Sequence, residues 1–319
     1  MNEQDQDVQQ MMQPLREREM ERKRFGMCIR VLLCAVVILG AGMLLKRAPG
    51  LERYWFVGPL LLVFGAGWLL KLSWENYREA YKNACVSSAL SELFTDLDYD
   101  PYGGISDRTI SETGMLYMGD SIFIDDSIRG RYNDVYLERS DLRIQEKRQQ
   151  RELEAQSYTE YGTPRTVNVT IFRGRWLIYD FKKTFRGDVQ IVQNGFRCAG
   201  QQKGMDTAFS RTGMELDSGN RHFRIYMKNV DGCFSISSSL MEQVQKLADS
   251  VRGKLMIGMI GSELHIAIDD FRGSLEPPLN VFLPIRKERV IRQVRGEMDS
   301  ITQFIDKLRL ENNLFIQED

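Results

Sequence analysis

Two apolar runs near the N-terminus constrain this chain more than any other feature. The first, FGMCIRVLLCAVVILGAGMLL, covers residues 25–45, and the second, YWFVGPLLLVFGAGWLL, covers residues 54–70. Each is close to the roughly 20 apolar residues that cross the core of a bilayer as a helix. Because only KRAPGLER separates them, the sequence predicts a two-span transmembrane hairpin over residues 25–72.

A cleaved signal peptide is the alternative interpretation of the first run, because basic residues precede it. The run begins after two dozen very polar residues, and no small-x-small cleavage site leads into a soluble chain before the second run. These two features favour the hairpin.

The distribution of lysine and arginine predicts the orientation of this hairpin. The charged segment 1–24 carries the largest group of basic residues, so we expect it to be cytoplasmic. An even number of spans then returns residues 73–319 to the same side, which predicts a multi-pass protein of the cell inner (cytoplasmic) membrane with both termini in the cytoplasm. The basic residues compared are Arg16, Arg18, Arg22, Lys23 and Arg24 before the hairpin, Lys46, Arg47 and Arg53 in its loop, and Lys71, Arg78 and Lys82 after it. The charges of the loop oppose this orientation.

Small residues and one arginine lie inside the two runs. Each run contains Gly-Ala-Gly, at residues 40–42 and 65–67, a pattern that favours close helix packing. In an antiparallel hairpin the two patterns lie at different depths, so we expect them to meet other helices and to support self-association. Arg30 lies about one turn inside the first span, where it can extend to the cytoplasmic interface.

Composition narrows the classes of partner and cofactor. The 43 basic residues balance 44 acidic ones, so no overall attraction to nucleic acid is expected. Five cysteines have no paired spacing and there are only two histidines, which argues against a disulfide framework and a zinc site. We therefore expect no metal, no cofactor and a reducing compartment.

The sequence after the hairpin predicts an α+β cytosolic region with a mixed, mostly antiparallel sheet. Apolar residues at helical spacing predict an amphipathic helix over 73–98 that continues from the second span and ends before Pro101. Short alternating runs then predict a β-rich domain over 99–196. The expected strands cover residues 115–117, 121–124, 135–144, 167–172 and 176–181.

A second region, over 221–319, combines strands and helices. A strand is expected at 222–227, and a capping box formed by Ser239 and Glu242 predicts a helix that closes at Gly253. A hairpin of strands 255–260 and 264–268 follows, and apolar residues with three-four spacing predict a long helix from about residue 284. This last helix either docks on the sheet or forms a short coiled coil.

Catalytic and metal-binding patterns are weak throughout. The acidic passage with Asp120, Asp125, Asp126 and Asp134 lacks the spacing of a calcium loop and is interpreted as solvated turn residues. The G-x-x-G in IGMIGS is interpreted as a hairpin turn. His265 is expected on the solvent face of its strand and His222 at the start of another, with no nucleophile placed beside either, so no catalytic residue is predicted.

The segment FRGRWLIYDFKKTFRG, residues 172–187, interleaves basic and aromatic residues. A hairpin turn at Arg173-Gly174-Arg175 would place both arginines at its tip, and the next turn would add three more cations. The candidate contact set for an anionic surface is Arg173, Arg175, Lys182, Lys183 and Arg186. Three interpretations remain open: a plain hairpin, a tip that contacts anionic lipid at about 1 kcal/mol per basic residue, and a nucleic-acid site.

The order of these parts resembles the uncharacterised bacterial membrane-protein family of domain of unknown function 3137. The resemblance rests on a charged N-terminal segment, two spans, and an F-x-G-x-aromatic stretch that runs into F-K-K-x-F-x-G. It continues in HFRIYMKNVDGCFSISSSLMEQVQKL and KLMIGMIGSELHIAID, with a departure from the family's alanine-bearing stretch at Asp231-Gly232-Cys233. The family implies no activity, cofactor or catalytic residue.

Three functions follow as hypotheses. The first is a membrane-tethered scaffold or adaptor that presents a cytosolic interaction module to an unknown protein partner. The second is a membrane-tethered module that binds lipid headgroups through the basic set. The third is an enzyme without a recognisable motif.

Overall fold

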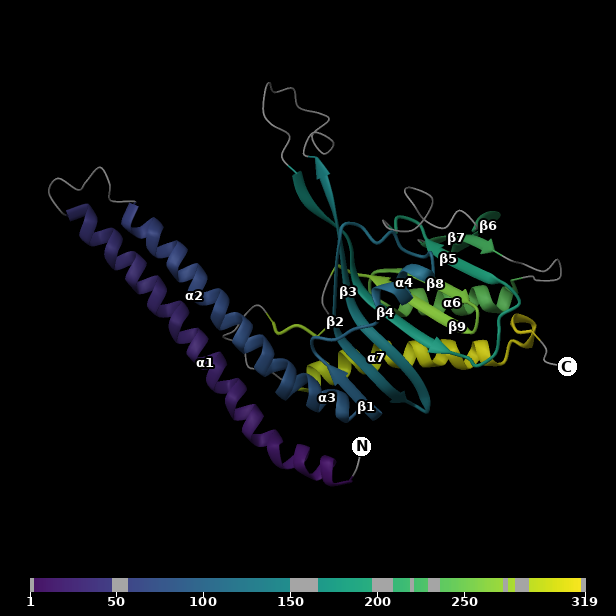
Figure 1. Cartoon of the computed structure of the whole chain (residues 1–319), viewed down its shortest axis with the longest axis horizontal. Coiled ribbons are helices and arrows are strands. Elements are labelled where there is room, and N and C mark those ends of the chain that lie inside the picture. Colours follow the sequence, from purple (N-terminus) through teal and green to yellow (C-terminus); the bar gives the residue numbers. More distant parts are fainter. Residues whose placement is uncertain are drawn as a thin grey trace, which may run out of the picture. The chain divides into compact units, whose positions relative to one another are not determined.

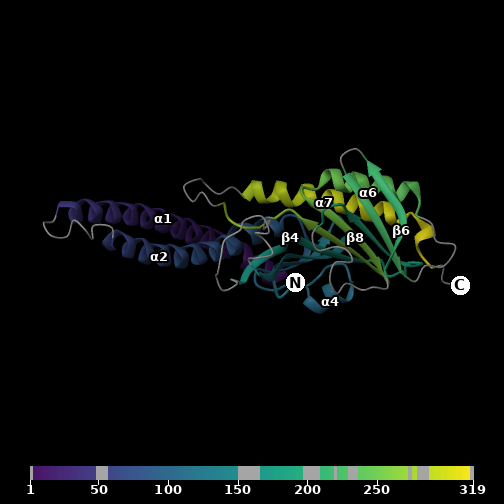
Figure 2. The ribbon, with the colours of Figure 1, turned by 90° about the horizontal axis from the view of Figure 1, so that it is seen from above.

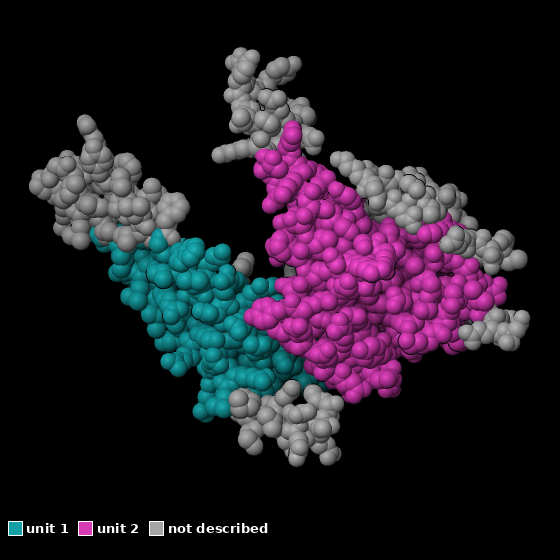
Figure 3. Space-filling model, viewed as in Figure 1, with its two compact units in different colours: residues 1–92, 275–292 teal, residues 93–274, 293–319 magenta. Residues whose placement is uncertain are grey.

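The computed structural model describes residues 3–47, 57–149, 166–196, 209–218, 221–228, 236–271, 275–278 and 287–316. The chain divides into two compact units (Figure 3). The first comprises residues 1–92 and 275–292, and the second comprises residues 93–274 and 293–319.

The first unit is built on two long helices, α1 (Glu3–Arg47) and α2 (Val57–Tyr81), which run side by side (Figures 1 and 2). Arg30 Nη1 of α1 donates to Ser73 Oγ of α2 at 2.7 Å, and this hydroxyl donates to Leu69 O at 2.8 Å. Arg30 is thus held by the partner helix. Both predicted apolar runs lie in helices, apart from residues 54–56, which are outside the described residues. In the part of the chain that the structure describes, no helix has the length and hydropathy needed to cross a membrane.

Three glycines of the two runs lie on open helix surface. A Cβ atom added at Gly40, Gly65 or Gly67 would meet no other atom within 4 Å. Self-association through these glycines stays a prediction.

The amphipathic helix that follows the second run is shorter than the predicted 73–98. After α2 the chain forms a π-helical turn, η2 (Lys82–Val86), and a short helix, α3 (Ser87–Ser91). The prediction of helix beyond this point is wrong, because Thr95–Asp100 form strand β1. The segment TDLDYD alternates polar and apolar residues with the period of a strand, and this short-range pattern prevails over the helical spacing before it.

Ion pairs within the first unit converge on Glu276. Arg78 Nε donates to both carboxylate oxygens of Glu276, at 2.9 and 2.7 Å, which gives the forked geometry of a strong pair. Lys82 Nζ, on the π-helical turn, lies 3.8 Å from the same carboxylate. Glu276 therefore connects residues 275–278 to the helices of the first unit.

The second unit contains an antiparallel sheet of nine strands within the described residues, which confirms the predicted α+β class. The strands in spatial order are β1, β2 (Ser121–Tyr132), β3 (Val135–Gln149), β4 (Thr166–Asp180), β9 (Glu263–Asp269), β8 (Lys254–Ile260), β5 (Asp188–Gln193), β7 (Arg221–Lys228) and β6 (Ser210–Ser218). The sequence predicts two separate regions here, a β-rich domain at 99–196 and an α+β region at 221–319. Both parts instead contribute neighbouring strands to one sheet, because β4 pairs with β9 and β5 pairs with β7 and β8.

Most of the expected strands agree with the structure, and one does not. Residues 121–124, 135–144, 222–227, 255–260 and 264–268 all lie in strands, and the turn between β8 and β9 falls at Gly261, whose φ is +61°. The expected strand at 115–117 is wrong: Met115 and Leu116 lie in the connection after α4 (Asp107–Glu112) and are buried in the core. Their apolar side chains pack in the core, although their backbone pairs with no strand.

Strand β4 corrects the predicted hairpin at Arg173-Gly174-Arg175. It is one continuous strand of 15 residues, and Gly174 pairs with Leu142 on one side and Asp269 on the other. A Cβ at Gly174 would lie 1.8 Å from Ile268 O, so glycine is required by the close approach of β9 and marks no turn.

Helices cover the sheet on both faces. Helices α6 (Ser238–Ser250) and α7 (Lys287–Arg309) lie on one face, and α4 lies on the other (Figure 2). α6 begins at Ser237, whose hydroxyl accepts the Leu240 N–H at 3.0 Å, two residues before the predicted cap. The predicted long C-terminal helix is confirmed as α7, and its apolar stripe docks on the sheet side, with Met298, Ile301 and Leu308 all buried. A short 3-10 turn, η3 (Asn312–Leu314), follows.

Candidate functional site

A buried group of charged side chains lies between α7 and the central strands of the second unit. We call Arg139, Asp141, Arg175, Asp270 and Glu297 the ionic cluster. Its side chains come from β3, β4, the end of β9 and α7, and each is at most 12% exposed. Such burial requires that the charges be paired, because an isolated ion is costly to remove from water.

Glu297 of α7 links the two arginines of the ionic cluster. Arg175 Nε lies 2.9 Å from Glu297 Oε1, and Arg139 Nε lies 3.6 Å from the same oxygen. Arg175 Nη1 donates to Asp270 Oδ2 at 2.8 Å, and Arg139 Nη2 donates to Asp141 Oδ1 at 3.0 Å. Three carboxylates therefore hold two guanidinium groups and fasten α7 to the sheet.

The carboxylates of the ionic cluster keep Arg175 protonated. Burial alone would lower the pKa of Arg175, but the carboxylates of Glu297 and Asp270 outweigh burial and raise the pKa of this guanidinium above its usual value. Arg175 therefore stays charged, and the geometry supports cross-linking of secondary structure.

The structure separates the five predicted anion contacts. Arg175 is 3% exposed and belongs to the ionic cluster, so the expectation that it projects from a tip is wrong. Arg173 is exposed in the middle of β4. Lys182 and Lys183 are exposed after the end of β4, about 30 Å along the strand from Arg173 at 3.3 Å per residue.

Two of these cations have partners of their own. Lys182 forms an ion pair with Asp180. Although burial opposes the effect, this contact and neighbouring hydrogen bonds lower the pKa of Asp180. Arg186 is half-buried and donates from Nε to Phe315 O at 2.9 Å, beside the stacked rings of Phe185 and Phe315. Arg186 thus helps to hold the C-terminal segment.

The acidic passage is only partly a set of solvated turns. Asp120 and Asp134 are exposed, and Asp134 lies with Asn133 in the β2–β3 turn at φ values of +61° and +47°. Asp126, in contrast, is fully buried and accepts the Tyr99 hydroxyl at 2.7 Å, which corrects the solvated interpretation for this residue. Burial and the Asp126 carboxylate raise the pKa of Tyr99.

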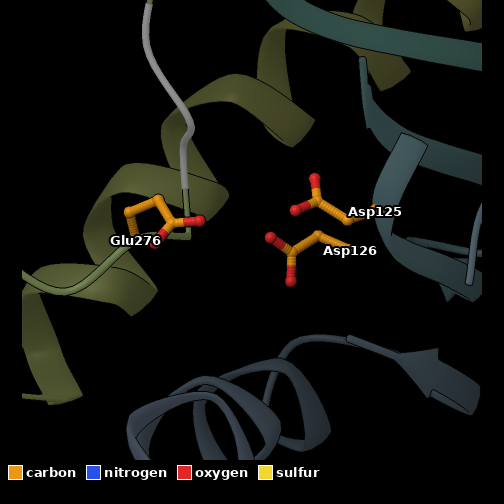
Figure 4. Close-up of side chains that lie close together, drawn as sticks. All are labelled: Asp125, Asp126 and Glu276. Carbon is orange, nitrogen blue, oxygen red and sulfur yellow. The ribbon is translucent and has the colours of Figure 1, made fainter. Parts of the chain in front are cut away.

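A β-bulge explains the direction of the two central carboxylates. Successive side chains of a strand point to opposite faces, yet Asp125 and Asp126 point the same way (Figure 4). The register of β2 against β3 shifts between Asp125 and Ile128, and Asp126 has a φ of +56°. Glu276, also drawn in Figure 4, belongs to the first unit and its ion pairs there are those with Arg78 and Lys82.

The histidines differ from the expectation. His222 lies in β7, as predicted. His265 is 2% exposed, so its predicted place on the solvent face is wrong; it points away from Leu264 and Ile266, but α4 and its flanking segments cover that second face. Its ring lies 5.8 Å from the Trp176 ring, and Nε2 lies 3.2 Å from Glu263 Oε2. The hydrogen bond from His265 lowers the pKa of Glu263.

Of the five residues in the ionic cluster, only Arg175 was a candidate from the sequence, and Arg139, Asp141, Asp270 and Glu297 were missed. Their only local signal is a charge inside an apolar pattern: Glu297 interrupts the stripe of α7 next to Met298, and Arg139 lies between the buried Leu137 and Ser140. Asp141 lies two residues from Arg139, but the other pairs join residues that are distant in the chain and leave no local pattern.

Comparison with known proteins gave one matching family. Residues 170–310 match the family described as Protein of unknown function (DUF3137), which confirms the resemblance found in the sequence. The match begins within β4 and ends just after α7.

Two further comparisons give no function. A comparison with curated proteins gave no match. Among solved structures, the crystal structure of the mycobacterial trehalose monomycolate transport factor A, TtfA, is similar with a TM-score of 0.38 and 11% identity, over 76% of this chain and 100% of that chain. A likeness of this size carries no argument.

Proposed function

We propose that this chain is a membrane-anchored protein that presents the α+β unit as an interaction module. The observation that carries the proposal is a set of large apolar side chains exposed on the paired helices α1 and α2. They are Phe25, Ile29, Leu32, Leu33, Val36, Val37 and Met43 on α1, and Val63, Trp68, Leu69 and Leu72 on α2. Each would gain about 1.5–3 kcal/mol by leaving water, and a bilayer offers that environment to both helices at once.

The polar parts of the same helices support the orientation. The part of α1 before the apolar run carries ion pairs at helical spacing, Lys23 with Glu19 and Arg24 with Glu21, as expected of a solvated segment. The proposed location is the inner membrane, with both termini cytoplasmic.

The interaction role rests on how the charged groups of the second unit are used. The ionic cluster pairs its arginines internally with Glu297, Asp270 and Asp141, as a structural cross-link requires. A scaffold or adaptor with an unidentified protein partner therefore fits this unit better than an enzyme does.

Binding of anionic lipid headgroups is the second candidate function. It is favoured by the exposure of Arg173, Lys182 and Lys183. Arg175 is left out of this contact set because it is buried.

Alkaline extraction of membranes tests the anchor. The full-length chain should remain in the membrane pellet after a carbonate wash. Leu33→Arg/Val36→Arg should move a large fraction to the supernatant, because each charge at mid-span costs about 2.5–3.5 kcal/mol. Glu79→Arg, at an exposed position of α2 after the apolar run, is the matched control and should stay in the pellet.

Two results would contradict the anchor or its orientation. Complete recovery of the unaltered chain in the first soluble fraction would overturn the anchor. Reporter fusions at the C-terminus and in the loop 46–53 test orientation, and a C-terminal reporter active only in the periplasm would reverse it.

A further inference from the structure

Two arginines face each other on neighbouring strands of the second unit. Arg143 of β3 and Arg173 of β4 are direct partners in the antiparallel register, and we call them the arginine pair. Directly opposed residues have Cβ atoms about 4.5–5.5 Å apart and project from the same face of the sheet. Arg173 is exposed and Arg143 is partly exposed, so solvent reaches both guanidinium groups.

The arginine pair has no acidic partner among the described residues. The carboxylates that follow on the same face are already engaged, Asp141 with Arg139 and Asp270 with Arg175. Two like charges directly opposite each other destabilise a sheet. The two arginines therefore repel each other. An anion bound between their guanidinium groups would replace this repulsion with attraction to both.

An aromatic ring orients one member of the arginine pair. The guanidinium carbon of Arg143 lies 4.4 Å from the centroid of the Phe123 ring, in a cation–π contact. Phe123 is Arg143's partner on β2 and is itself 46% exposed. A cation–π contact uses none of the guanidinium's N–H donors as hydrogen bonds, so they remain able to meet a ligand.

Further groups around the arginine pair extend the same surface. Lys147, two pleats along β3, is exposed and adds a third positive charge. Phe271 is 43% exposed and its N–H donates to Arg173 O at 2.8 Å, which places a second aromatic residue beside the pair. Asp125, two residues after Phe123, bounds this surface on the β2 side.

We propose that the arginine pair, with Phe123, binds a phosphate group. Arginine forks match phosphate oxygens in a bidentate manner, and two forks separated by one strand spacing can hold one phosphate between them. The phosphate belongs either to an anionic phospholipid headgroup or to a free phosphate. The headgroup form rests on the proposed membrane anchor, whereas the free-phosphate form does not.

Calorimetry on the full-length protein in a non-ionic detergent tests this proposal. The probes are dihexanoyl-phosphatidylglycerol and inorganic phosphate, each titrated at fixed low salt. Arg143→Gln/Arg173→Gln should weaken binding at least tenfold, because both charge-assisted forks to the phosphate are lost. Lys246→Gln/Arg252→Gln removes the same charge at exposed positions of α6 and of the turn after it, outside both proposed contact sets, and should bind as the unaltered chain does.

The outcomes separate the sources of phosphate. Binding of the lipid alone supports a headgroup site, and binding of both probes supports a site for any phosphate. Binding of neither probe overturns the proposal, as does an equal loss in both double variants, which would indicate unspecific charge attraction. Because the titration needs no bilayer, it stands even if membrane extraction disproves the anchor.

A conservative variant separates the loss of phosphate recognition from misfolding. Arg143→Lys/Arg173→Lys keeps both charges but loses the forked geometry, so its affinity should lie between those of the unaltered chain and the glutamine variant. Unchanged affinity in the lysine variant would refute bidentate recognition.

Discussion

At the scale of single residues, the buried carboxyl group of Asp269 destabilises the folded state when it is ionised. Its side chain lies in the second unit, 3% exposed, and Oδ2 has no hydrogen-bond partner in the described residues. Burial raises the pKa of this carboxyl above its usual value, although N–H groups of Arg173 and Phe271 oppose the shift. The folded state therefore binds this proton more tightly than the unfolded state does. Stability is lost as the pH rises from the unfolded pKa, about 3.9, through the higher folded pKa.

Asp269→Asn tests this direction. The variant removes the buried charge, so its free energy of unfolding should fall less steeply between pH 4 and pH 7 than that of the unaltered chain. Urea unfolding at several pH values measures the slope. Asp134→Asn, in the exposed β2–β3 turn, is the matched control and should leave the slope unchanged. An identical slope for Asp269→Asn and the unaltered chain would show that the carboxyl titrates normally.

At the scale of secondary-structure elements, Glu297 connects α7 to the sheet. It contacts both arginines of the ionic cluster, so removing its charge leaves two buried cations with one carboxylate fewer. Glu297→Gln should lower the free energy of unfolding by about 3–5 kcal/mol, the usual cost of breaking a buried pair. Glu288→Gln, exposed on the same helix, should change it little. If denaturant unfolding shows the same stability for Glu297→Gln and Glu288→Gln, the ionic cluster does not fasten α7.

The arginine pair leads to the opposite expectation for β3 and β4. Arg173→Thr relieves the repulsion with Arg143 and adds a residue that suits strands, so it should raise the free energy of unfolding by about 0.2–1 kcal/mol. Thermal unfolding of the full-length chain measures the gain, with Lys183→Thr, after the end of β4, as the control. A loss of stability would mean that Arg173 has a stabilising role of its own and would weaken the case for a phosphate site.

At the scale of elements, the sequence predicted where most strands lie. It did not predict which distant strands and side chains contact each other. Alternation correctly placed β7, β8 and β9 along the chain, but it did not reveal that both faces of β8 and β9 are buried. Gly174 between two arginines imitates a turn, whereas its real cause is the approach of Ile268 O, which lies on another strand. The burial of Arg175 depends on Asp270, 95 residues away, and on Glu297 of α7, so no local pattern could separate it from the exposed Arg173.

At the scale of the whole molecule, the two units bury apolar surface in different ways. The second unit buries its large side chains internally, and Trp176 is 0% exposed in its core. The paired helices of the first unit leave comparable side chains outside, and Trp68 of α2 is 67% exposed. The proposed anchor would account for this difference, because acyl chains would cover the apolar surface of α1 and α2.

Brominated lipids test this difference directly, because they quench only tryptophans that contact acyl chains. In the full-length chain reconstituted into brominated phosphatidylcholine, tryptophan emission should be lower than in the unbrominated lipid. Trp68→Phe should remove part of this lipid-dependent quenching, whereas Trp176→Phe should leave its absolute size unchanged, because Trp176 lies in a protein core. Equal quenching in the unaltered chain and in Trp68→Phe would place α2 outside the hydrocarbon and would contradict the anchor.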